Sequence, residues 1–432
     1  MNKRIIVVGA GIAGLTTAYY LGKYGYKVKL LEASSKVGGR MLTFQNEKYI
    51  IDTGAQFLSS GYKNILKLLK ELNLTHEIVE TTQKGGIIKN NKIYSLDYHN
   101  PFSLLISGFL NPKQFFSLAV GSLRLNKRIK DFSPSVYSDW HSFDTETTQK
   151  WSDKYYGNTI TEYLFEPTLE AFYFQSPNET SKALPIAISK FNSFKTITLK
   201  SGINRLALEL SKKIDIEFKS KITAIENHNF KVKVHTADKS YSADYIVLAT
   251  TADIAKELHK NANSIEKKLL NTKYSTTINI AFGLKNRLSN KFGYYGIFIP
   301  RKERKNIAAI AIESNKHSKR VAEGDLINVM LSGKSGKHYI NKSENEVINM
   351  VKDELERYIP NISSDIVFTK IFKWNKAEPF SQVGRSKYIS KYRKAINSKN
   401  KILLVGDYMG MPFTEGAVET GKWISDKIKS FD

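Results

Sequence analysis

The chain alternates short, continuous apolar runs with segments in which apolar residues recur at helical spacing. Residues 5–8 form a β-branched run of the length expected for a buried parallel strand. Apolar positions then recur at the period of a helix between Gly14 and Gly25, and residues 27–31 form a second strand-like run. This strand–helix–strand order predicts an α/β protein built on a parallel sheet.

Further along the chain the pattern changes from one type of element to the other. Residues 101–110 and 115–125 are apolar bursts separated by Asn-Pro-Lys-Gln at 111–114, which predicts two short helices or a helical hairpin. Residues 294–300 and 306–314 alternate like strands and predict a sheet.

An aromatic set stands out in residues 160–181, which otherwise read as helical. Aromatic residues on a helix usually belong to the core, but the same set could wall a pocket for a large apolar or aromatic substrate. Its members are Tyr163, Phe165, Phe172, Tyr173 and Phe174.

Three glycines punctuate the first strand–helix junction. Gly9, Gly11 and Gly14 stand in a G-x-G-x-x-G arrangement between the first strand and the helix, and Glu32 directly follows the second strand. This is the full context of a dinucleotide fingerprint. In it, Gly9 would make the tight turn, Gly11 would let a pyrophosphate approach the backbone, and Gly14 would let helix and strand pack closely. Glu32 would accept the ribose hydroxyls, and the helix N-terminus would attract the phosphates.

The segments that follow carry a resemblance to a known family. "EASSKVGGRM" places Gly39 and Arg40 after the acid, and "IDTGAQF" places Gly54 and Gln56 a few residues later. With these motifs the chain resembles the flavin-containing amine oxidoreductase superfamily, in particular its protoporphyrinogen-oxidase-like and phytoene-desaturase-like branches. The resemblance implies FAD as the cofactor, with the first segment bordering its phosphates and the second running beside its isoalloxazine ring.

The resemblance extends over most of the chain. Residues 201–250 look like the middle third of the FAD domain, where the backbone at Ile222 would hold the adenine. Residues 372–380 are similar to a tryptophan-containing strand that returns to the flavin, and residues 402–425 look like the C-terminal flavin motif, with a helix that opens at the flavin. The cofactor-binding residues expected on this basis are Gly9, Gly11, Ile12, Ala13, Gly14, Glu32, Ala33, Gly39, Arg40, Met41, Gly54, Ala55, Gln56, Phe57, Ile222, Trp374, Gly406, Asp407, Thr414, Glu415, Gly416 and Ala417.

These flavin-related segments are discontinuous, which predicts two interleaved domains. A Rossmann-like FAD-binding domain would comprise residues 1–75, 200–285 and 380–432. An α+β substrate-binding domain would comprise residues 76–199 and 286–379 and cover the flavin face. A length of 432 residues agrees with two domains.

The chain has one dinucleotide fingerprint. "GKSGKH" near Gly333 lacks the glycine that a P-loop needs five positions earlier, and it is not expected to open a helix after a strand. Enzymes that reduce flavin with NADPH commonly need a second nucleotide site. We therefore expect the flavin to be reduced by the organic substrate itself, a small molecule and not a macromolecule. The electrons would then pass to oxygen, a quinone or another acceptor.

Composition sets the outer limits. The net charge is +25, but 54 of the 66 basic residues are lysine and they are spread along the chain, so nucleic-acid binding is not expected. Attraction to an anionic membrane surface is more plausible, and the apolar bursts at 101–125 are either substrate-domain core or a surface that dips into a bilayer.

The absence of cysteine excludes a cysteinyl-flavin bond, and the eight histidines show no metal-ligand spacing. With no signal peptide or spanning segment apparent, we expect a cytoplasmic protein, with peripheral membrane association as the alternative.

Together, the residues and the resemblance predict an FAD-dependent oxidoreductase that desaturates a large apolar or aromatic substrate by hydride transfer to flavin N5. Gln56, Tyr173 and Asn279 are the candidates for flavin-side contacts. Amine oxidases of the superfamily place a lysine beside N5, and the corresponding position in "YSTTINIAFGL" is Asn279, which disfavours small amines. Two alternatives remain: an amine or amino-acid oxidase, and a flavoprotein whose FAD is structural or drives a non-redox isomerisation.

Overall fold

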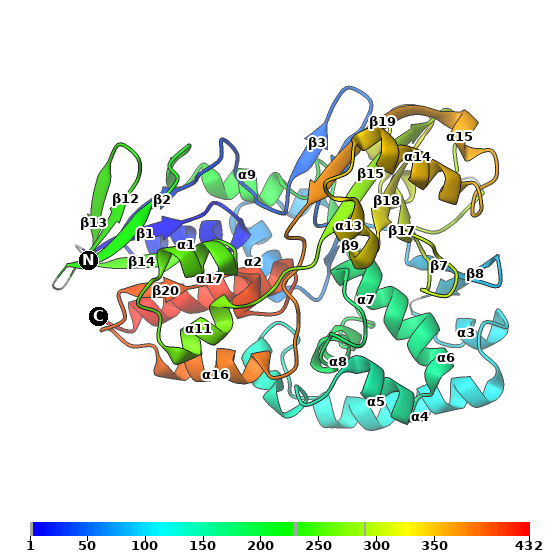
Figure 1. Cartoon of the computed structure of the whole chain (residues 1–432), viewed down its shortest axis with the longest axis horizontal. Coiled ribbons are helices and arrows are strands. Elements are labelled where there is room, and N and C mark those ends of the chain that lie inside the picture. Colours follow the sequence, from blue (N-terminus) through cyan, green and yellow to red (C-terminus); the bar gives the residue numbers. More distant parts are fainter. Residues whose placement is uncertain (1–2, 98, 229–230, 289–290) are drawn as a thin grey trace.

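The computed structural model describes residues 3–97, 99–228, 231–288 and 291–432, and it has two lobes (Figure 1). One lobe contains a parallel sheet and both ends of the chain. The other contains an antiparallel sheet that lies beside a group of helices. Lys3 forms an ion pair with Asp432, so the two ends of the chain lie side by side.

Five parallel strands form the sheet of the first lobe, in the order β10–β2–β1–β14–β20. They are β1 (Arg4–Val8), β2 (Lys27–Leu31), β10 (Asp215–Glu217), β14 (Tyr245–Leu248) and β20 (Ile402–Leu404). Every residue of β14 and β20 is buried, because both faces of the sheet are covered, and this explains the continuous apolar runs. The helix α1 (Ile12–Lys23) joins β1 to β2, which confirms the α/β prediction.

Helices cover the parallel sheet, and the first and last of them pack together. Ser425 on α17 (Thr414–Lys429) donates a hydrogen bond to the carbonyl of Thr17 on α1, at 3.2 Å. The other helices of this lobe are α2 (Lys63–Glu71), α9 (Arg205–Ser211), α10 (Ala252–Leu258), α11 (Ser264–Leu270) and α16 (Arg385–Ala395). An antiparallel ribbon projects from the lobe and consists of β11 (Ala224–His228), β12 (Lys231–His235) and β13 (Ser240–Ala243).

The second lobe contains a seven-stranded sheet in the order β19–β15–β18–β17–β16–β7–β8. All its pairs are antiparallel except β16 with β7. Its strands are β7 (Lys84–Lys89), β8 (Lys92–Asp97), β15 (Thr277–Leu284), β16 (Gly296–Phe298), β17 (Ile307–Ile312), β18 (Asp325–Leu331) and β19 (Ile366–Trp374). The two strand-like runs expected in the second insert are β16 and β17.

The two faces of this sheet differ in side-chain size. Large aliphatic residues, such as Ile280 and Val329, pack on one face against α14 (Glu344–Leu355). The alternate positions carry small or polar residues, namely Asn279, Ala281, Ala309, Ala311 and Asn328. Because side chains alternate along a strand, one face forms an aliphatic core and the other carries mostly smaller or polar side chains.

The strand β15 lies on the other side of the predicted domain boundary from the sheet that it joins. The expected FAD-binding segment 200–285 contains β15, yet β15 is a central strand of the seven-stranded sheet, paired with β18 and β19. A fully apolar run does not reveal which sheet a strand joins, because central strands of both sheets are buried. The division of the chain into two domains stays a prediction.

Helices dominate the first insert. The bursts at 101–110 and 115–125 form α3 (Ser103–Ile106) and α4 (Pro112–Ile129), and Asn111 caps α4 by accepting a hydrogen bond from Gln114. The further helices are α5 (Thr148–Tyr155), α6 (Asn158–Ile160), α7 (Glu166–Tyr173) and α8 (Ala183–Ser189). Within the described residues, no helix combines the length and apolar character needed to cross a membrane.

Short elements connect the lobes. The hairpin β3 (Thr43–Gln45) and β4 (Ile50–Asp52) leads into the "IDTGAQF" segment. A small sheet follows, made of β5 (Leu58–Ser59), β6 (Ile78–Glu80) and β9 (Thr196–Leu199).

One local expectation was wrong. "GKSGKH" does open a helix after a strand, because α13 (Gly333–Tyr339) follows β18 directly and Ser332 caps it. Glycine disfavours a helix, but close packing here requires it: a Cβ on Gly336 would lie 2.4 Å from the carbonyl oxygen of Thr276. The position five residues before Gly333 is Asn328, so the P-loop pattern remains incomplete.

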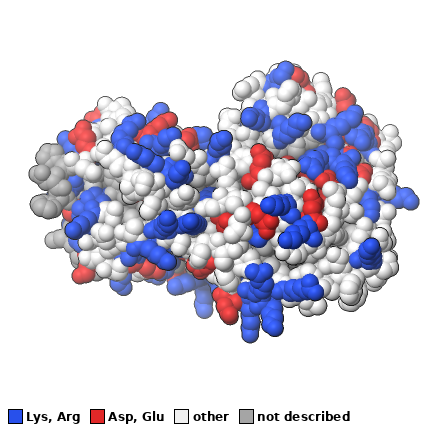
Figure 2. Space-filling model, turned by 60° about the horizontal axis from the view of Figure 1, so that its bottom comes forward, with Lys and Arg blue, Asp and Glu red and all other residues white. Residues whose placement is uncertain are grey.

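Charge is spread over the surface. Figure 2 shows one face, on which lysine and arginine occur on both lobes and acidic residues lie among them. This distribution agrees with a lysine excess that is dispersed along the chain.

Candidate functional site

The glycine turn between β1 and α1 is built to leave space for a ligand. Gly9 has φ +102°, and a Cβ on Gly14 would lie 2.0 Å from the carbonyl oxygen of Gly9. By contrast, a Cβ on Gly11 would meet nothing within 4 Å. Gly11 is the N-cap of α1, and no side chain among the described residues caps it. The N–H groups of Ile12 and Ala13 therefore start a helix next to open space, which is the arrangement that binds a phosphate.

A second glycine pair closes on the first. The N–H of Gly38 donates to the carbonyl of Ala10 at 2.8 Å, and a Cβ on Gly39 would approach the Cα of Gly11 to 3.2 Å. Met41 is buried in the core of the first lobe. The "GGR" segment therefore packs on the glycine turn, and Arg40 emerges beside it.

Glu32 directly follows β2 and places its carboxylate at the glycine turn. Oε2 accepts a hydrogen bond from the N–H of Ala10 at 2.6 Å, and Oε1 accepts one from the N–H of Ser34 at 2.8 Å. Ala33 next to it is exposed. The N–H of Ser220 donates to the carbonyl of Glu32, which brings the segment leading to Ile222 to the same edge of the sheet.

Arg40 and Asp407 join the "GGR" segment to the end of β20. Arg40 Nη1 lies 2.6 Å from Asp407 Oδ2 and donates to the carbonyl of Ala377 at 2.8 Å. Gly406, with φ +131°, turns the chain after β20 so that Asp407 reaches this point. The guanidinium also lies 5.5 Å from the ring centre of Tyr274.

Sequence reasoning missed an acid at this place. Burial raises the pKa of Glu378 well above its ordinary value, while Arg40 opposes the shift. Glu378 belongs to the "FKWNKAEPF" segment, and an acid between alanine and proline at the end of an apolar strand was the available signal. Arg385, at the start of α16, acts on Glu378 in the same direction as Arg40 and donates to the carbonyl of Gly410 at 2.8 Å.

The helix α17 begins where it was expected. Its N-cap is Phe413, and no described side chain caps its first turn, formed by Thr414, Glu415, Gly416 and Ala417. Because α1 follows β1 and α17 follows β20, both helices begin at the carboxyl edge of the parallel sheet, where α/β proteins bind nucleotides.

Glu415 turns away from that edge. Its carboxylate accepts hydrogen bonds from the N–H and side-chain amide of Asn64, both at 2.8 Å, and from the N–H of Ile65 at 3.0 Å. It thereby caps α2. Burial raises the pKa of Glu415 to about 7 although these three donors favour the charged form. Its side chain is thus engaged within the protein, and only its backbone can face a ligand.

Four side chains hold the "IDTGAQF" segment in place. Asn279 and Trp374 donate to the carbonyl of Thr53, at 2.9 and 2.6 Å. Gln56 and Asn328 donate to the carbonyl of Asp52, at 2.7 and 3.2 Å.

The segment also lies against the "GGR" turn. The N–H of Ala55 donates to the carbonyl of Arg40 at 2.9 Å, and a Cβ on Gly54 would lie 2.1 Å from the same oxygen. The structure therefore brings the two motifs of the resemblance into direct contact.

The three candidate flavin-contact residues differ in their surroundings. The Oδ1 atoms of Asn279 and Asn328 are both buried, and neither has a hydrogen-bond partner among the described residues. Two unpaired acceptors therefore lie on the small-residue face of the second sheet. The amide nitrogen of Gln56 is used within its own segment. Tyr173 is buried at the end of α7, and burial raises the pKa of its hydroxyl well above the ordinary value.

Aromatic rings adjoin the same face. Phe57 meets Phe172 edge-on with ring centres 5.2 Å apart, and it meets Tyr295 at 6.5 Å. Phe172 in turn meets Phe298 at 5.5 Å. These rings pack with the small side chains of β17 and with Met330. Of the aromatic set expected to wall a pocket, Phe172 and Phe174 join this cluster, whereas Tyr163 contacts Phe109 near α4.

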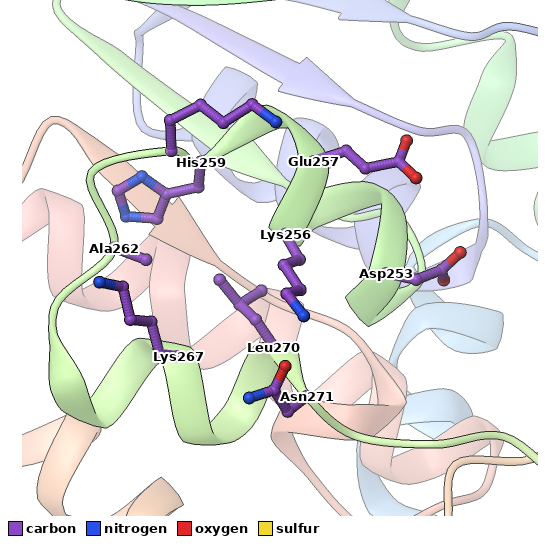
Figure 3. A pocket seen from close by; sticks show the side chains of 9 residues that line it. Asp253, Lys256, Glu257, His259, Ala262, Lys267, Leu270 and Asn271 are labelled. Carbon is purple, nitrogen blue, oxygen red and sulfur yellow. The ribbon is translucent and has the colours of Figure 1, made fainter.

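A surface pocket of about 540 Å³ lies elsewhere, between α10 and α11 (Figure 3). Lys256, Lys267 and Asn271 point toward it. His259 also lines it and pairs with the buried Glu266, with Nε2 and Oε2 3.2 Å apart. Its lysines are exposed and no residue of the glycine turn or of residues 52–57 lines it. The candidate site is therefore the carboxyl edge of the parallel sheet together with the small-residue face of the second sheet.

The residues at this edge fit a flavin dinucleotide. The cradle at Gly11, two uncapped helix N-termini, a carboxylate at the end of β2 and a half-exposed arginine are the donor and acceptor set that its phosphates and ribose need.

Comparison with known proteins supports this assignment. The family of flavin containing amine oxidoreductases matches residues 12–428. Coproporphyrinogen III oxidase of Bacillus subtilis is 23% identical over 92% of this chain and 91% of its own length.

Solved structures show the same fold. A protein from Exiguobacterium sp. 255-15, provisionally assigned as a protoporphyrinogen oxidase, superposes with a TM-score of 0.82, at 17% identity and over the whole of both chains. Cyclohexylamine oxidase of Brevibacterium oxydans superposes with a TM-score of 0.77 at 15% identity, covering 100% of this chain and 99% of its own.

Proposed function

The chain belongs to the flavin-containing amine oxidoreductase family, and on that premise we propose that it is an FAD-dependent oxidase of a porphyrinogen-like substrate. The observation that carries the proposal is the wall formed by Phe57, Phe172, Tyr295 and the alanines of β17, beside a buried asparagine at position 279. A large ring system fits such a wall, whereas a small amine would find no lysine at that position. The match to a coproporphyrinogen III oxidase over nearly its full length supports the same substrate class.

FAD is the proposed form of the flavin. Its pyrophosphate would lie at Gly11, Ile12 and Ala13, and its adenosine ribose at Glu32. Arg40 would border the phosphates and Asp407 the ribityl chain. When bound, FAD supplies the hydride acceptor, N5. The N-terminus of α17 would stabilise negative charge on the reduced ring, because its free N–H groups and helix dipole point there.

Residues 54–57 would orient the ring and the substrate. Asn279 and Trp374 fix the backbone of this segment through Thr53. The side chain of Phe57 contributes to the wall that excludes water from the reacting atoms. The electron acceptor would be oxygen or a quinone.

Glu32→Ala is expected to weaken FAD binding by about ten- to hundredfold, or roughly 1.5–3 kcal/mol, because charge-assisted contacts to the ribose are lost. The dissociation constant is measured by quenching of flavin fluorescence on titration of the apoprotein. Because Glu32 also accepts from Ala10, Glu32→Gln serves as the control: it keeps acceptor capacity and should lose less affinity than the alanine variant. Equal affinity of wild type and Glu32→Ala would contradict the ribose role.

Steady-state oxidation assays test the substrate class. We expect turnover of a porphyrinogen and little turnover of benzylamine or a polyamine, because the apolar wall binds a large ring system and position 279 is asparagine. Efficient turnover of either amine with an inert porphyrinogen would favour the alternative, an amine or amino-acid oxidase. A flavin that no substrate reduces would favour a structural or isomerase role.

We also propose that α3 and α4 contact an anionic membrane surface. Four apolar side chains there are strongly exposed: Phe102 (57%), Ile106 (79%), Phe116 (69%) and Leu123 (72%). The helix α4 carries four basic residues and no acidic residue, so its charge complements anionic lipid.

Vesicle sedimentation tests this contact. The protein should co-sediment with vesicles containing phosphatidylserine, and the double variant Phe116→Ser with Leu123→Ser should bind several-fold less. Val367→Ser is the control, because Val367 is 58% exposed but lies on β19. Sedimentation that is absent, or that the double variant leaves unchanged, would rule the contact out.

A further inference from the structure

Four charged side chains lie together in the interior with no exposure to solvent. They are Asp52 at the end of β4, Glu313 and Lys316 of α12 (Glu313–Lys316), and Arg320 of the following 3₁₀ turn (Ser318–Arg320). Lys316 Nζ and Arg320 Nη1 each lie 2.7 Å from Asp52 Oδ2, and they lie 3.5 and 3.7 Å from Glu313 Oε2. We call these four residues the buried ion cluster.

The cluster is energetically costly for the folded state. Each buried ion carries a desolvation penalty of several kcal/mol, and apolar residues of similar volume usually stabilise as well or better. Burial opposes ionisation of Asp52, yet Arg320 and Lys316 hold its pKa at about 2, so the carboxylate stays charged. Such a cluster indicates a requirement for precise geometry.

The cluster lies directly behind the segment that follows Asp52. The other carboxylate oxygen, Oδ1, accepts from the N–H of Ile203 at 2.9 Å and from the hydroxyl of Thr43 at 2.8 Å. The backbone carbonyl of Asp52 accepts from Gln56 and Asn328. Every acceptor of Asp52 is therefore held, and residues 53–57 start from a fixed point.

The cluster also reaches the second lobe and the aromatic wall. Lys316 Nζ lies 5.7 Å from the ring centre of Tyr295, whose ring packs edge-on against Phe57. Arg320 donates to the hydroxyl of Thr198 and the carbonyl of Leu199 on β9, at 2.9 and 3.0 Å. The cluster thus connects Asp52, which precedes the "TGAQF" stretch, with Tyr295 of the substrate wall.

We propose that the buried ion cluster sets the position of residues 53–57 relative to Phe172 and Tyr295 of the substrate wall, with Lys316 and Arg320 as positioning residues for hydride transfer. This inference rests on the proposed function. A displacement of about 1 Å in reacting groups can lower a rate about a hundredfold, so a rigid anchor at Asp52 has a direct kinetic consequence. Burial raises the pKa of Glu313, and its proximity to both cations opposes that shift.

Lys316→Met alone would leave an uncompensated acid in the interior and could unfold the protein. The double variant Lys316→Met with Glu313→Gln removes one charge of each sign and leaves the Arg320–Asp52 pair, so the cluster stays neutral. Lys182→Met is the control. It breaks the partly buried ion pair of Lys182 with Glu146, 2.7 Å apart, which lies outside the cluster.

The experiment uses FAD-loaded protein and compares three readouts: the visible spectrum of the flavin, its dissociation constant, and the rate of anaerobic flavin reduction at saturating porphyrinogen. In the double variant we expect a shifted flavin spectrum and a rate at least about tenfold lower, with the FAD dissociation constant changed less than about threefold. The control should keep the wild-type spectrum and rate.

A double variant that folds and keeps the wild-type spectrum and reduction rate would overturn the positioning role and leave the cluster as a purely structural device. A wild-type protein that binds FAD but is not reduced by any porphyrinogen would instead contradict the proposed function. In that case the flavin spectrum of the double variant, recorded without substrate, still tests the cluster: an unchanged spectrum would overturn its role.

Discussion

Gly14→Ala should abolish flavin binding and lower the free energy of unfolding by at least about 3 kcal/mol. The new Cβ would lie 2.0 Å from the carbonyl oxygen of Gly9 and 3.1 Å from the Cβ of Ala249. Both neighbours belong to the closely packed junction of β1, β14 and α1, so neither can move without disrupting the sheet. Overpacking of this kind against backbone exceeds the usual cost of about 1–3 kcal/mol for an extra methylene.

Gly22→Ala is the matched control on the same helix. A Cβ there would meet nothing within 4 Å, so alanine should be neutral or stabilise the protein by up to about 1 kcal/mol through its higher helix propensity. Urea unfolding and the flavin-to-protein ratio after gel filtration measure both variants. Wild-type stability and flavin content in Gly14→Ala would show that the close approach at this junction is not required.

Arg304→Met is expected to destabilise the protein by about 3–5 kcal/mol, because it leaves buried carboxylates without their cation. Arg304 Nη2 lies 2.6 Å from Glu166 Oε1 and 3.6 Å from Glu170 Oε1, and both acids belong to α7. Burial already raises the pKa of Glu170 while Arg304 opposes the shift. Without Arg304, Glu170 should hold its proton more tightly in the folded than in the unfolded protein, because burial raises its pKa and the opposing cation is gone. Stability of the variant should therefore fall further as the pH rises above the ordinary glutamate pKa of about 4.3.

Arg301→Met is the comparison for this prediction. Arg301 pairs with Glu162 from the same helical region, but its side chain is 44% exposed. Its loss should cost less than the loss of Arg304, because water can reach the place of the exposed guanidinium beside Glu162. Denaturant unfolding at pH 5 and pH 8 separates the two variants. Equal losses, or a loss in Arg304→Met that does not grow with pH, would show that the acids of α7 do not depend on this arginine.

The motifs that depend on local backbone geometry could be predicted from the sequence. The glycine turn, the helix α1 and the strand that ends in Glu32 are fixed by spacing within about thirty residues. The opening of α17 at Thr414 was also predictable, because a complete motif surrounds it.

Features that depend on tertiary contacts could not be predicted. Lys316 and Arg320 stand in "ESNKHSKR", which reads as a solvated basic stretch, and only the fold brings Asp52 to them. Glu415 lies within a cofactor motif, yet its carboxylate caps α2, and this could not be predicted because its partner Ile65 lies 350 residues earlier in the chain. Similarly, β15 reads as a buried strand without revealing which sheet it joins.

An anaerobic titration of the purified, FAD-loaded protein with coproporphyrinogen III, followed by flavin absorbance, tests the proposed oxidase function most directly. The oxidised flavin band should bleach in proportion to the substrate added, with two electrons leaving the porphyrinogen for each flavin reduced, and oxygen or a quinone should restore the band. NADPH in place of the substrate should bleach the band no faster than it bleaches free FAD. A flavin that stays oxidised with the porphyrinogen but bleaches rapidly and saturably with NADPH or with a small amine would contradict the central claim.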